Sequence, residues 1–400
     1  MPRSSNLFKR KKLFLASIKL LAEKPFAFFS AGTVNGEIRV VFLDMRSLLK
    51  VLVLRGIRLL KRYGCFRSFI RELNTFRGNH LERIAVLLIE MLLPMDNSQS
   101  ALRTLVYFDL FDYPLTQEEI GLFMDRKVTP DELTFVMNQL SEQGLVFPHG
   151  EYFSLKNAEN LESRRKTGNQ LASRLLPIAF RISSFLFHFP FVRGIGISGS
   201  LSKNFADENA DIDYFIITKA NRLWITRTLM HLYKKLTFLV GRQHFYCMNY
   251  YIDEEALAIQ EKNVYTAVEV ATLIPVCGNG SMENFFTANA WIDDYYPNYV
   301  IDVESRKNSG HSWFKRSMEF LINIFPANKL DNYLMKITTN RWKRKEAAQM
   351  VNYVGRRMGL HTDKHFSKPN PNHLQKQILV MYETRWREIQ ERAQLLVTSY

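Results

Sequence analysis

The sequence predicts an α+β fold, in which helices back a small mixed sheet. Three observations predict it. Short apolar strands separated by an amphipathic helix occur between residues 192 and 252. Two helix-capping signatures precede them, and helical apolar spacing dominates the C-terminal region. Four hundred residues exceed one typical domain, and the pattern divides into four regions: 1–98, 99–157, 158–255 and 256–400.

Residues 1–98 form a basic, mainly helical region. Apolar spacing predicts helices over Leu48–Tyr63 and Leu81–Leu93, and a strand over Ile38–Leu43. Residues 1–100 hold 18 Lys and Arg against 7 Asp and Glu, in a chain of net charge +15. Such an excess favours contact with a polyanion, which could be nucleic acid, an anionic membrane surface or a phosphorylated substrate. Ordinary solvated helix faces are the alternative.

The sequence also predicts a soluble, cytoplasmic protein. Its three cysteines, Cys65, Cys247 and Cys277, are far apart and match neither a metal-binding spacing nor a disulfide framework. Lys9 to Lys12 precede an apolar stretch, but charged residues interrupt that stretch and no cleavage site follows. No run of eighteen apolar residues occurs, so no transmembrane segment is expected.

Residues 99–157 have the order of a winged helix, with three helices followed by a hairpin. Thr116 with Glu119, and Thr129 with Glu132, form capping boxes that open the second and third helices. The third helix, Asp131 to Gln143, contains no Lys or Arg. We therefore expect this segment to pack against the rest of the chain without reading DNA bases. The first helix and the two hairpin strands are predicted at 101–112, 145–147 and 152–155.

The next region is predicted to alternate helices with short strands. A helix covers 160–192 and another covers 222–240. Three strands are expected at Val192 to Ser198, Asp211 to Thr218 and His244 to Ile252. After Asp253 the sequence is typical mainly of helix, with breaks at prolines and glycines.

The residues that indicate chemistry are Gly199-Ser200 and, after ten intervening residues, Asp211-Ile212-Asp213. A Gly-Ser turn at a strand end exposes backbone N–H groups and a hydroxyl, with no Cβ to exclude a triphosphate. Asp211 and Asp213 are two apart on a strand, so their side chains point to the same face. Paired carboxylates are the hard oxygen ligands that Mg²⁺ and Mn²⁺ prefer. An isolated carboxylate inside an apolar run is otherwise costly.

This pattern resembles the DNA polymerase β-like nucleotidyltransferase superfamily, and uncharacterised bacterial members with a winged-helix-like segment ahead of that domain. The resemblance covers about residues 192–253. It implies that Asp211 and Asp213 are catalytic metal ligands for Mg²⁺ or Mn²⁺. It also implies that Gly199 and Ser200 bind the phosphates of a nucleoside triphosphate such as ATP, with Lys203 as a further phosphate contact.

The superfamily usually carries a third carboxylate on a later strand, and this sequence departs from that pattern. Two residues are candidates there. Asn249 is nearer the expected register but neutral, and Asp253 is the better ligand chemically. Counting along a regular strand places both on one face. Asp253 is predicted as a catalytic residue and Asn249 as an alternative third ligand.

The predicted function is transfer of a nucleoside monophosphate from a triphosphate to an acceptor hydroxyl on a small molecule, a protein or RNA. One alternative is a degenerate fold that acts as a basic adaptor for nucleic acid or a partner. A glycosyltransferase is disfavoured, because only one short strand precedes the Asp pair. The basic run Arg341 to Lys345 could bind RNA or phosphate, or form a solvated helix face. Glu269 is interpreted as a solvent or packing partner.

Overall fold

The computed structural model describes residues 28–34, 37–43 and 97–398, except for a small set within the last range. The residues left out there are 209, 238, 240, 242, 279, 302, 304–312, 352–358 and 370–373. Two compact units are present, 1–99 with 388–400, and 100–387. In the first unit, β1 (Phe28–Val34) and β2 (Glu37–Leu43) form an antiparallel hairpin. β2 confirms the predicted strand, whereas the helices predicted over 48–63 and 81–93 lie outside the described residues.

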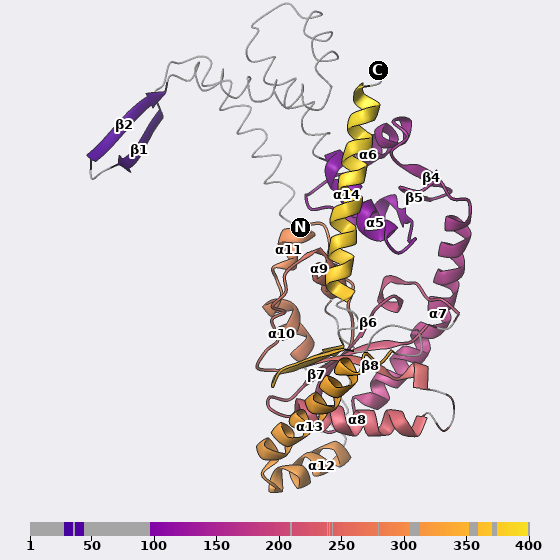
Figure 1. The fold of residues 1–400 in the computed structure, drawn as a ribbon, viewed down its shortest axis with the longest axis vertical. Coiled ribbons are helices and arrows are strands. Elements are labelled where there is room, and N and C mark those ends of the chain that lie inside the picture. The colour runs from indigo at the N-terminus through magenta and orange to yellow at the C-terminus, as the bar shows by residue number, and fades with distance from the viewer. Residues whose placement is uncertain are drawn as a thin grey trace, which may run out of the picture. The chain divides into compact units, whose positions relative to one another are not determined.

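The second unit begins with helices and a small antiparallel sheet (Figure 1). Both predicted capping boxes are confirmed. The side chains of Thr116 and Thr129 each accept from the backbone N–H three residues later, and the glutamate at that position accepts from the backbone N–H of the threonine. A short strand between the first two helices was not predicted, and it pairs with the hairpin. The elements are residues 100–109 of a helix that begins at residue 97, β3 (Leu115–Thr116), α5 (Gln117–Leu122), α6 (Pro130–Glu142), β4 (Phe147–His149) and β5 (Tyr152–Ser154).

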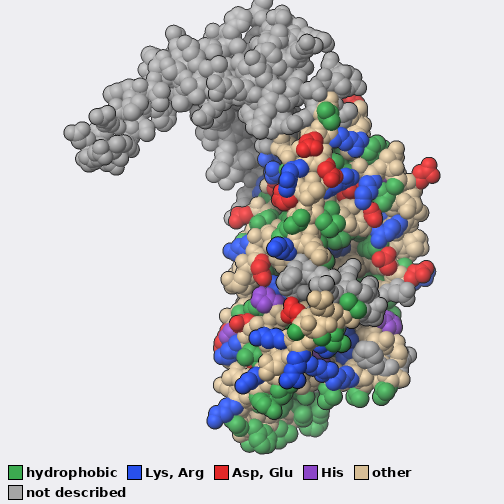
Figure 2. All heavy atoms as spheres, viewed as in Figure 1, with side chains coloured by type: hydrophobic (Ala, Val, Ile, Leu, Met, Phe, Trp, Pro, Cys, Tyr) green, Lys and Arg blue, Asp and Glu red, His purple; other side chains and the backbone are tan. Residues whose placement is uncertain are grey.

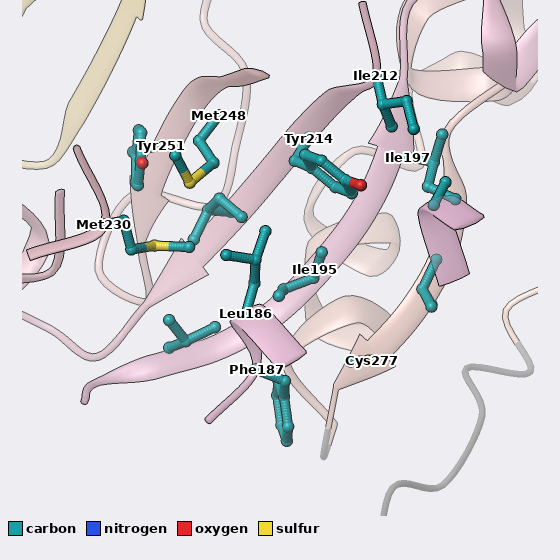
Figure 3. Close-up of a cluster of buried hydrophobic side chains, with 14 of the residues drawn as sticks. Leu186, Phe187, Ile195, Ile197, Ile212, Tyr214, Met230, Met248, Tyr251 and Cys277 are labelled. Carbon is teal, nitrogen blue, oxygen red and sulfur yellow. The ribbon is translucent and has the colours of Figure 1, made fainter. Parts of the chain in front are cut away.

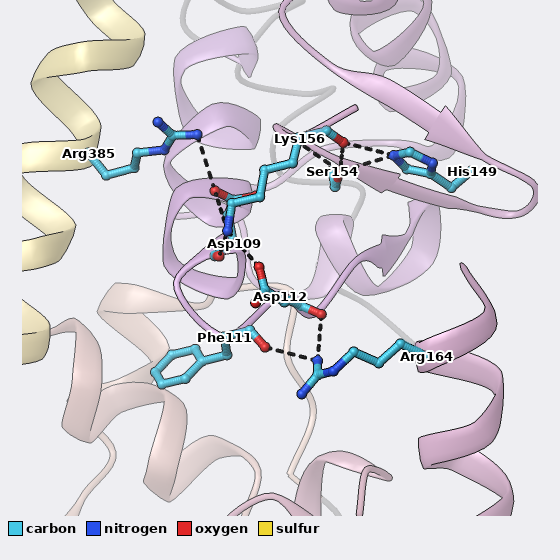
Figure 4. Close-up of polar contacts among 8 residues, drawn as sticks. All are labelled: Asp109, Phe111, Asp112, His149, Ser154, Lys156, Arg164 and Arg385. Carbon is cyan, nitrogen blue, oxygen red and sulfur yellow. Dashed lines mark hydrogen bonds and ion pairs between the residues drawn. The ribbon is translucent and has the colours of Figure 1, made fainter. Parts of the chain in front are cut away.

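A polar network ties this segment to the helices beside it (Figure 4). The buried carboxylate of Asp109 lies between Lys156 and Arg385, at 3.7 and 3.4 Å. Burial raises the pKa of Asp109, and the two cations oppose that rise. Arg164 donates to the backbone carbonyls of Phe111 and Asp112. As the sequence predicts, the segment packs against the rest of its unit.

A six-stranded mixed sheet occupies the middle of the second unit, in the order β10-β11-β8-β7-β6-β9. β7 and β8 are parallel because the crossover helix α8 (Leu223–Thr237) joins them, and the other neighbours are antiparallel. The three strands that the sequence predicts for this region are β6 (Val192–Ser198), β7 (Asp213–Thr218) and β8 (Cys247–Asp253).

The C-terminal region is not only helical, because it contributes half of this sheet. β9 (Ile274–Gly278) contains Pro275, which is tolerated because β9 is an edge strand. β10 (Leu360–Thr362) and β11 (Phe366–Pro369) add a hairpin to β8 at the other edge. These strands are too short for their apolar pattern to distinguish them from loops.

The main core lies between this sheet and the helices α7 (Asn160–Leu186) and α8 (Figure 3). Alternate side chains of the strands fill it, except where bulges in β6 and β8 shift the alternation. The opposite face of the sheet is covered by α10 (Ser281–Ala288). There the ring of Phe285 packs on that of Phe215, with 4.8 Å between the ring centroids. Fully buried core residues include Leu186, Ile195, Ile197, Ile212, Tyr214, Ile216, Met230, Met248 and Tyr251.

The remaining helices are α9 (Val264–Ala271), α11 (Ile292–Tyr295), α12 (Trp313–Ile324), α13 (Ala327–Ala347) and α14 (Leu374–Thr398). Asn263 caps α9 through a third capping box. Asp331 of α13 accepts from the backbone N–H of Ile225, which satisfies an orphan donor at the start of α8. Among the described residues, no helix is long and apolar enough to span a bilayer.

Candidate nucleotide-binding site

The Gly-Ser turn lies directly beside the Asp pair. Ser198, the last residue of β6, pairs with Asp213, the first residue of β7. Gly199 then turns with φ of +72°, a conformation that L side chains rarely adopt. A Cβ at Gly199 would lie 2.5 Å from Oδ2 of Asp213, which is closer than real contacts allow. The positive φ therefore favours glycine here, and a Cβ would displace the Asp213 carboxylate.

Side chains of the next turn hold the Gly199 carbonyl in place. Ser202 Oγ and Lys203 Nζ donate to it, at 2.9 and 3.0 Å. The carbonyl of Ser200 accepts from the backbone N–H groups of Lys203 and Phe205, which closes the short 3-10 helix over Leu201–Lys203. The Ser200 side chain is exposed. The turn is thus fixed on its inner side and presents a hydroxyl on its outer side.

Asp211 and Asp213 are both partly exposed, while Ile212 and Tyr214 between and after them are fully buried. This alternation is expected if the two aspartates lie on the face away from the core. Burial, followed by the charge of Asp211, raises the pKa of Asp213 from 3.8 to about 7. Hydrogen bonding with Cys247 opposes this rise. The pair therefore has an excess of negative charge that a cation would relieve.

Asn249 occupies the position next to Asp213 on the neighbouring strand. A bulge lies there, because Tyr214 pairs with Met248 but Phe215 pairs with Tyr250. Asn249 is the extra residue, and its Nδ2 donates to Asp213 Oδ1. Its amide nitrogen, and not its oxygen, faces Asp213. Asn249 therefore lies where the third carboxylate was expected, as a hydrogen-bond donor.

The prediction that Asp253 belongs to the catalytic set is not supported by its position. Asp253 pairs with Thr218 at the far end of the parallel strands, five residue steps from Asp213, or about 17 Å. It is fully buried and accepts from His365 Nδ1 at 2.9 Å and from the backbone N–H of Asn221 at 3.0 Å. These bonds make Asp253 a structural carboxylate that joins the β10–β11 hairpin to the sheet.

The predicted shared face of Asn249 and Asp253 is also wrong, and the bulge is the reason. Met248 and Tyr251 are three residues apart, yet both enter the main core. A regular strand would place them on opposite faces. Because the extra residue shifts the parity, Asn249 and Asp253 face opposite sides of the sheet.

Two charged residues that the sequence did not assign to the site lie close to it. Glu269 of α9 forms an ion pair with Lys203 at 2.9 Å, and its charge helps raise the pKa of Asp213. Lys234 of α8 lowers that pKa. Lys203 is therefore already paired with Glu269, and Glu269 has the structural role of a packing partner. Both Glu269 and Lys234 come from helices remote in sequence, so no local motif points to them.

A hollow of about 590 Å³ lies at the N-terminal end of α9. Aromatic residues are the most numerous kind in its lining, which also includes the carboxylates of Asp125, Asp294 and Glu383. The aromatic residues that line it are Tyr107, Phe108, Phe123, Tyr295, Tyr296, Tyr382 and Trp386.

The oxygen donors beside the turn are the carboxylates of Asp211 and Asp213, which fit a divalent cation chemically. Within the described part of the chain, no group of three or more His, Cys, Asp or Glu side chains is placed to hold a metal ion. The amide of Asn249, where a third carboxylate would be needed, is consistent with that result.

A scan of family models, a search of curated proteins and a search of solved structures each returned no match to this chain.

Proposed function

We propose that residues 158–255 form a metal-dependent nucleotidyltransferase core that transfers a nucleoside monophosphate from a triphosphate to an acceptor hydroxyl. One observation carries the proposal. The pairing of Ser198 with Asp213 sets a glycine turn, whose conformation and space exclude a side chain, directly against a carboxylate of raised pKa. Phosphate binding needs a turn that presents backbone N–H groups, and phosphoryl transfer needs oxygen ligands beside it.

In this proposal Asp211 and Asp213 hold Mg²⁺ or Mn²⁺. The cation, when bound, supplies electrostatic stabilisation of the phosphates and of the attacking oxygen. The Gly199-Ser200 turn binds phosphate through backbone N–H groups and the exposed hydroxyl. Lys203, held by Glu269, fixes the Gly199 carbonyl and so the shape of the turn. Lys234 contributes positive charge from the side of α8.

The aromatic hollow beside α9 is the proposed pocket for the base or the acceptor, because stacking on aromatic faces suits a planar ring. We further infer that residues 99–157 are a winged-helix-like module with a packing role. In support, the hydroxyl of Tyr113 donates to the carbonyl of Lys203, so this module contacts the turn itself.

The second candidate is a degenerate core that binds nucleotide or nucleic acid as an adaptor. Asn249 favours it, because a neutral amide that donates to Asp213 leaves the set one carboxylate short. Binding of nucleic acid that weakens with salt, without consumption of triphosphate, would support this alternative. A glycosyltransferase would instead hydrolyse or transfer from sugar nucleotides.

The deciding experiment incubates the full chain with each nucleoside triphosphate and Mg²⁺ or Mn²⁺, and measures pyrophosphate release beside nucleotide binding. Turnover that Asp213→Asn reduces about 10²-fold or more supports the enzyme. Asp131→Asn, an exposed carboxylate on α6, is the matched control and should leave turnover unchanged. Binding without pyrophosphate release in the wild type supports the adaptor. Neither binding nor turnover refutes both.

A further inference from the structure

Helix α12 carries a stripe of large apolar side chains that face solvent. Trp313 is 78% exposed, Phe320 69% and Ile324 62%. Their spacing of seven and four residues places them on one side of the helix. Phe314, Leu321 and Phe325 beside them are also more than half exposed.

The opposite side of α12 is anchored to the sheet. The buried Lys315 donates through Nζ to the carbonyls of Phe187 and Val192, at 2.8 and 2.6 Å. Glu319 binds Arg193 with both carboxylate oxygens, each at 2.9 Å. Because these buried and paired charges fix the inner face, the aromatic face cannot turn inward without breaking them.

The apolar surface continues onto α13. Leu330, Tyr333 and Ile337 are exposed and follow one another at three and four residues, which is one helix face. Figure 2 shows hydrophobic side chains gathered over α12 and the start of α13, with Lys and Arg side chains next to them. We call this surface the apolar patch, and it comprises Trp313, Phe314, Phe320, Leu321, Ile324, Phe325, Leu330, Tyr333 and Ile337.

A cationic hollow adjoins the apolar patch. Ile337 lines both, and the hollow of about 530 Å³ is otherwise lined by Asn340, Met350 and three cations, Arg341, Arg344 and Lys345. Among the described residues, no carboxylate forms an ion pair with these three. Burial, then the charges of Arg341 and Lys235, lowers the pKa of Lys345. Like charges gathered without a counter-ion favour an anionic ligand.

We propose that α12 and α13 dock on an anionic membrane surface, with the apolar patch entering the headgroup region and the cationic hollow binding lipid phosphates. A helix with aromatic and aliphatic residues on one face lies in the plane of such an interface. Lys and Arg beside it add attraction to anionic lipid. This inference is independent of the proposed nucleotidyltransferase activity.

A membrane accounts for both features, whereas other occupants account for one. A second copy of the chain could cover the apolar patch, but it would bring another chain of net charge +15 against the cationic hollow. Nucleic acid would neutralise the cations but would leave aliphatic side chains such as Leu321 and Ile324 in water.

The test is sedimentation of the full chain with vesicles of phosphatidylcholine alone, or of phosphatidylcholine mixed with phosphatidylglycerol. We expect binding to the anionic vesicles only, and weaker binding as salt rises. Phe320→Asp should reduce it about tenfold or more. Arg341→Ala and Arg344→Ala should each reduce it roughly fivefold. Phe135→Asp is the matched control, because Phe135 is an exposed phenylalanine on α6, and it should bind as the wild type does.

A second measurement reports on the fold and on insertion. Tryptophan fluorescence should shift to the blue with anionic vesicles, and Trp313→Phe should lose most of that shift while it still binds. Three results overturn the proposal. The first is no binding of the wild type to vesicles. The second is an equal loss of vesicle binding in Phe320→Asp and Phe135→Asp. The third is a concentration-dependent dimer that Phe320→Asp dissociates, together with no vesicle binding by the wild type. If Phe320→Asp melts far below the wild type, the fluorescence of Trp313→Phe tests the proposal in its place, and a blue shift equal to that of the wild type would overturn it.

Discussion

Asp213→Asn is expected to stabilise the metal-free protein at alkaline pH while it abolishes turnover. In the folded chain, burial and the charge of Asp211 raise the pKa of Asp213 from 3.8 to about 7. Between about pH 4 and pH 7, the folded state therefore holds a proton that the unfolded state has lost. The stability that this proton contributes is complete below about pH 4 and is lost as pH rises through about 7. Asparagine is neutral at every pH, so it removes the loss.

The magnitude follows from the shift of the pKa. About three pKa units at roughly 1.4 kcal/mol each give about 4 kcal/mol as the largest effect on the free energy of unfolding. Asp213 is partly exposed, so solvent screening reduces this to about 2 kcal/mol. For a unit of about 290 residues, that corresponds to a rise in melting temperature of about 3 °C.

The assay is thermal melting in EDTA at pH 8 and pH 4.5, for the wild type, Asp213→Asn and the exposed control Asp131→Asn. We expect a clear gain for Asp213→Asn at pH 8, a much smaller gain at pH 4.5 and no pH-dependent difference for the control. A variant that melts at or below the wild type at pH 8 would refute the reasoning. An equal gain at both pH values would show that charge is not the cause.

Three further outcomes are expected. Gly199→Ala should reduce pyrophosphate release about 10²-fold. Gly241 has a similar positive φ but open space around it, so Gly241→Ala should lose only stability. Equal activity in both variants would contradict the close contact between position 199 and Asp213. Mg²⁺ affinity, measured by calorimetry, should rise about tenfold per pH unit up to about pH 7 and then level off, because the cation displaces the proton on Asp213; a flat profile would exclude Asp213 as a ligand. Asp253→Asn should lower the free energy of unfolding by about 3 kcal/mol, because the Asp253 carboxylate is fully buried and holds His365 and the backbone N–H of Asn221. A melting curve like that of the wild type would contradict this role.

Local signals predicted the elements well, because their causes are local. The capping boxes at Thr116 and Thr129 begin their helices where the sequence indicates, since each box needs only four residues. The strand Val192–Ser198 has the predicted bounds because the Gly-Ser turn ends it. The bounds of β9 and of the β10–β11 hairpin could not be predicted, since such short strands are specified by the edge they pair with.

The candidate site was predictable to the extent that it is local. Gly199, Ser200, Asp211 and Asp213 lie within fifteen residues, and the strand pairing brings the turn against Asp213. The position of Asp253 could not be predicted, because counting along a strand assumes that no residue is inserted. Long-range contacts such as the ion pair of Glu269 depend on how α9 packs, which no spacing rule describes.

The bulge in β8 separates the residue that contacts Asp213 from the residues that build the core. Because Asn249 is extra to the ladder, its deletion would leave Met248 opposite Tyr214 and Tyr250 opposite Phe215. The core would keep its register, and only the neighbour of Asp213 would disappear. An insertion of this kind gives the chain a position at which the chemistry of the site can change by substitution or loss, with little penalty to the fold.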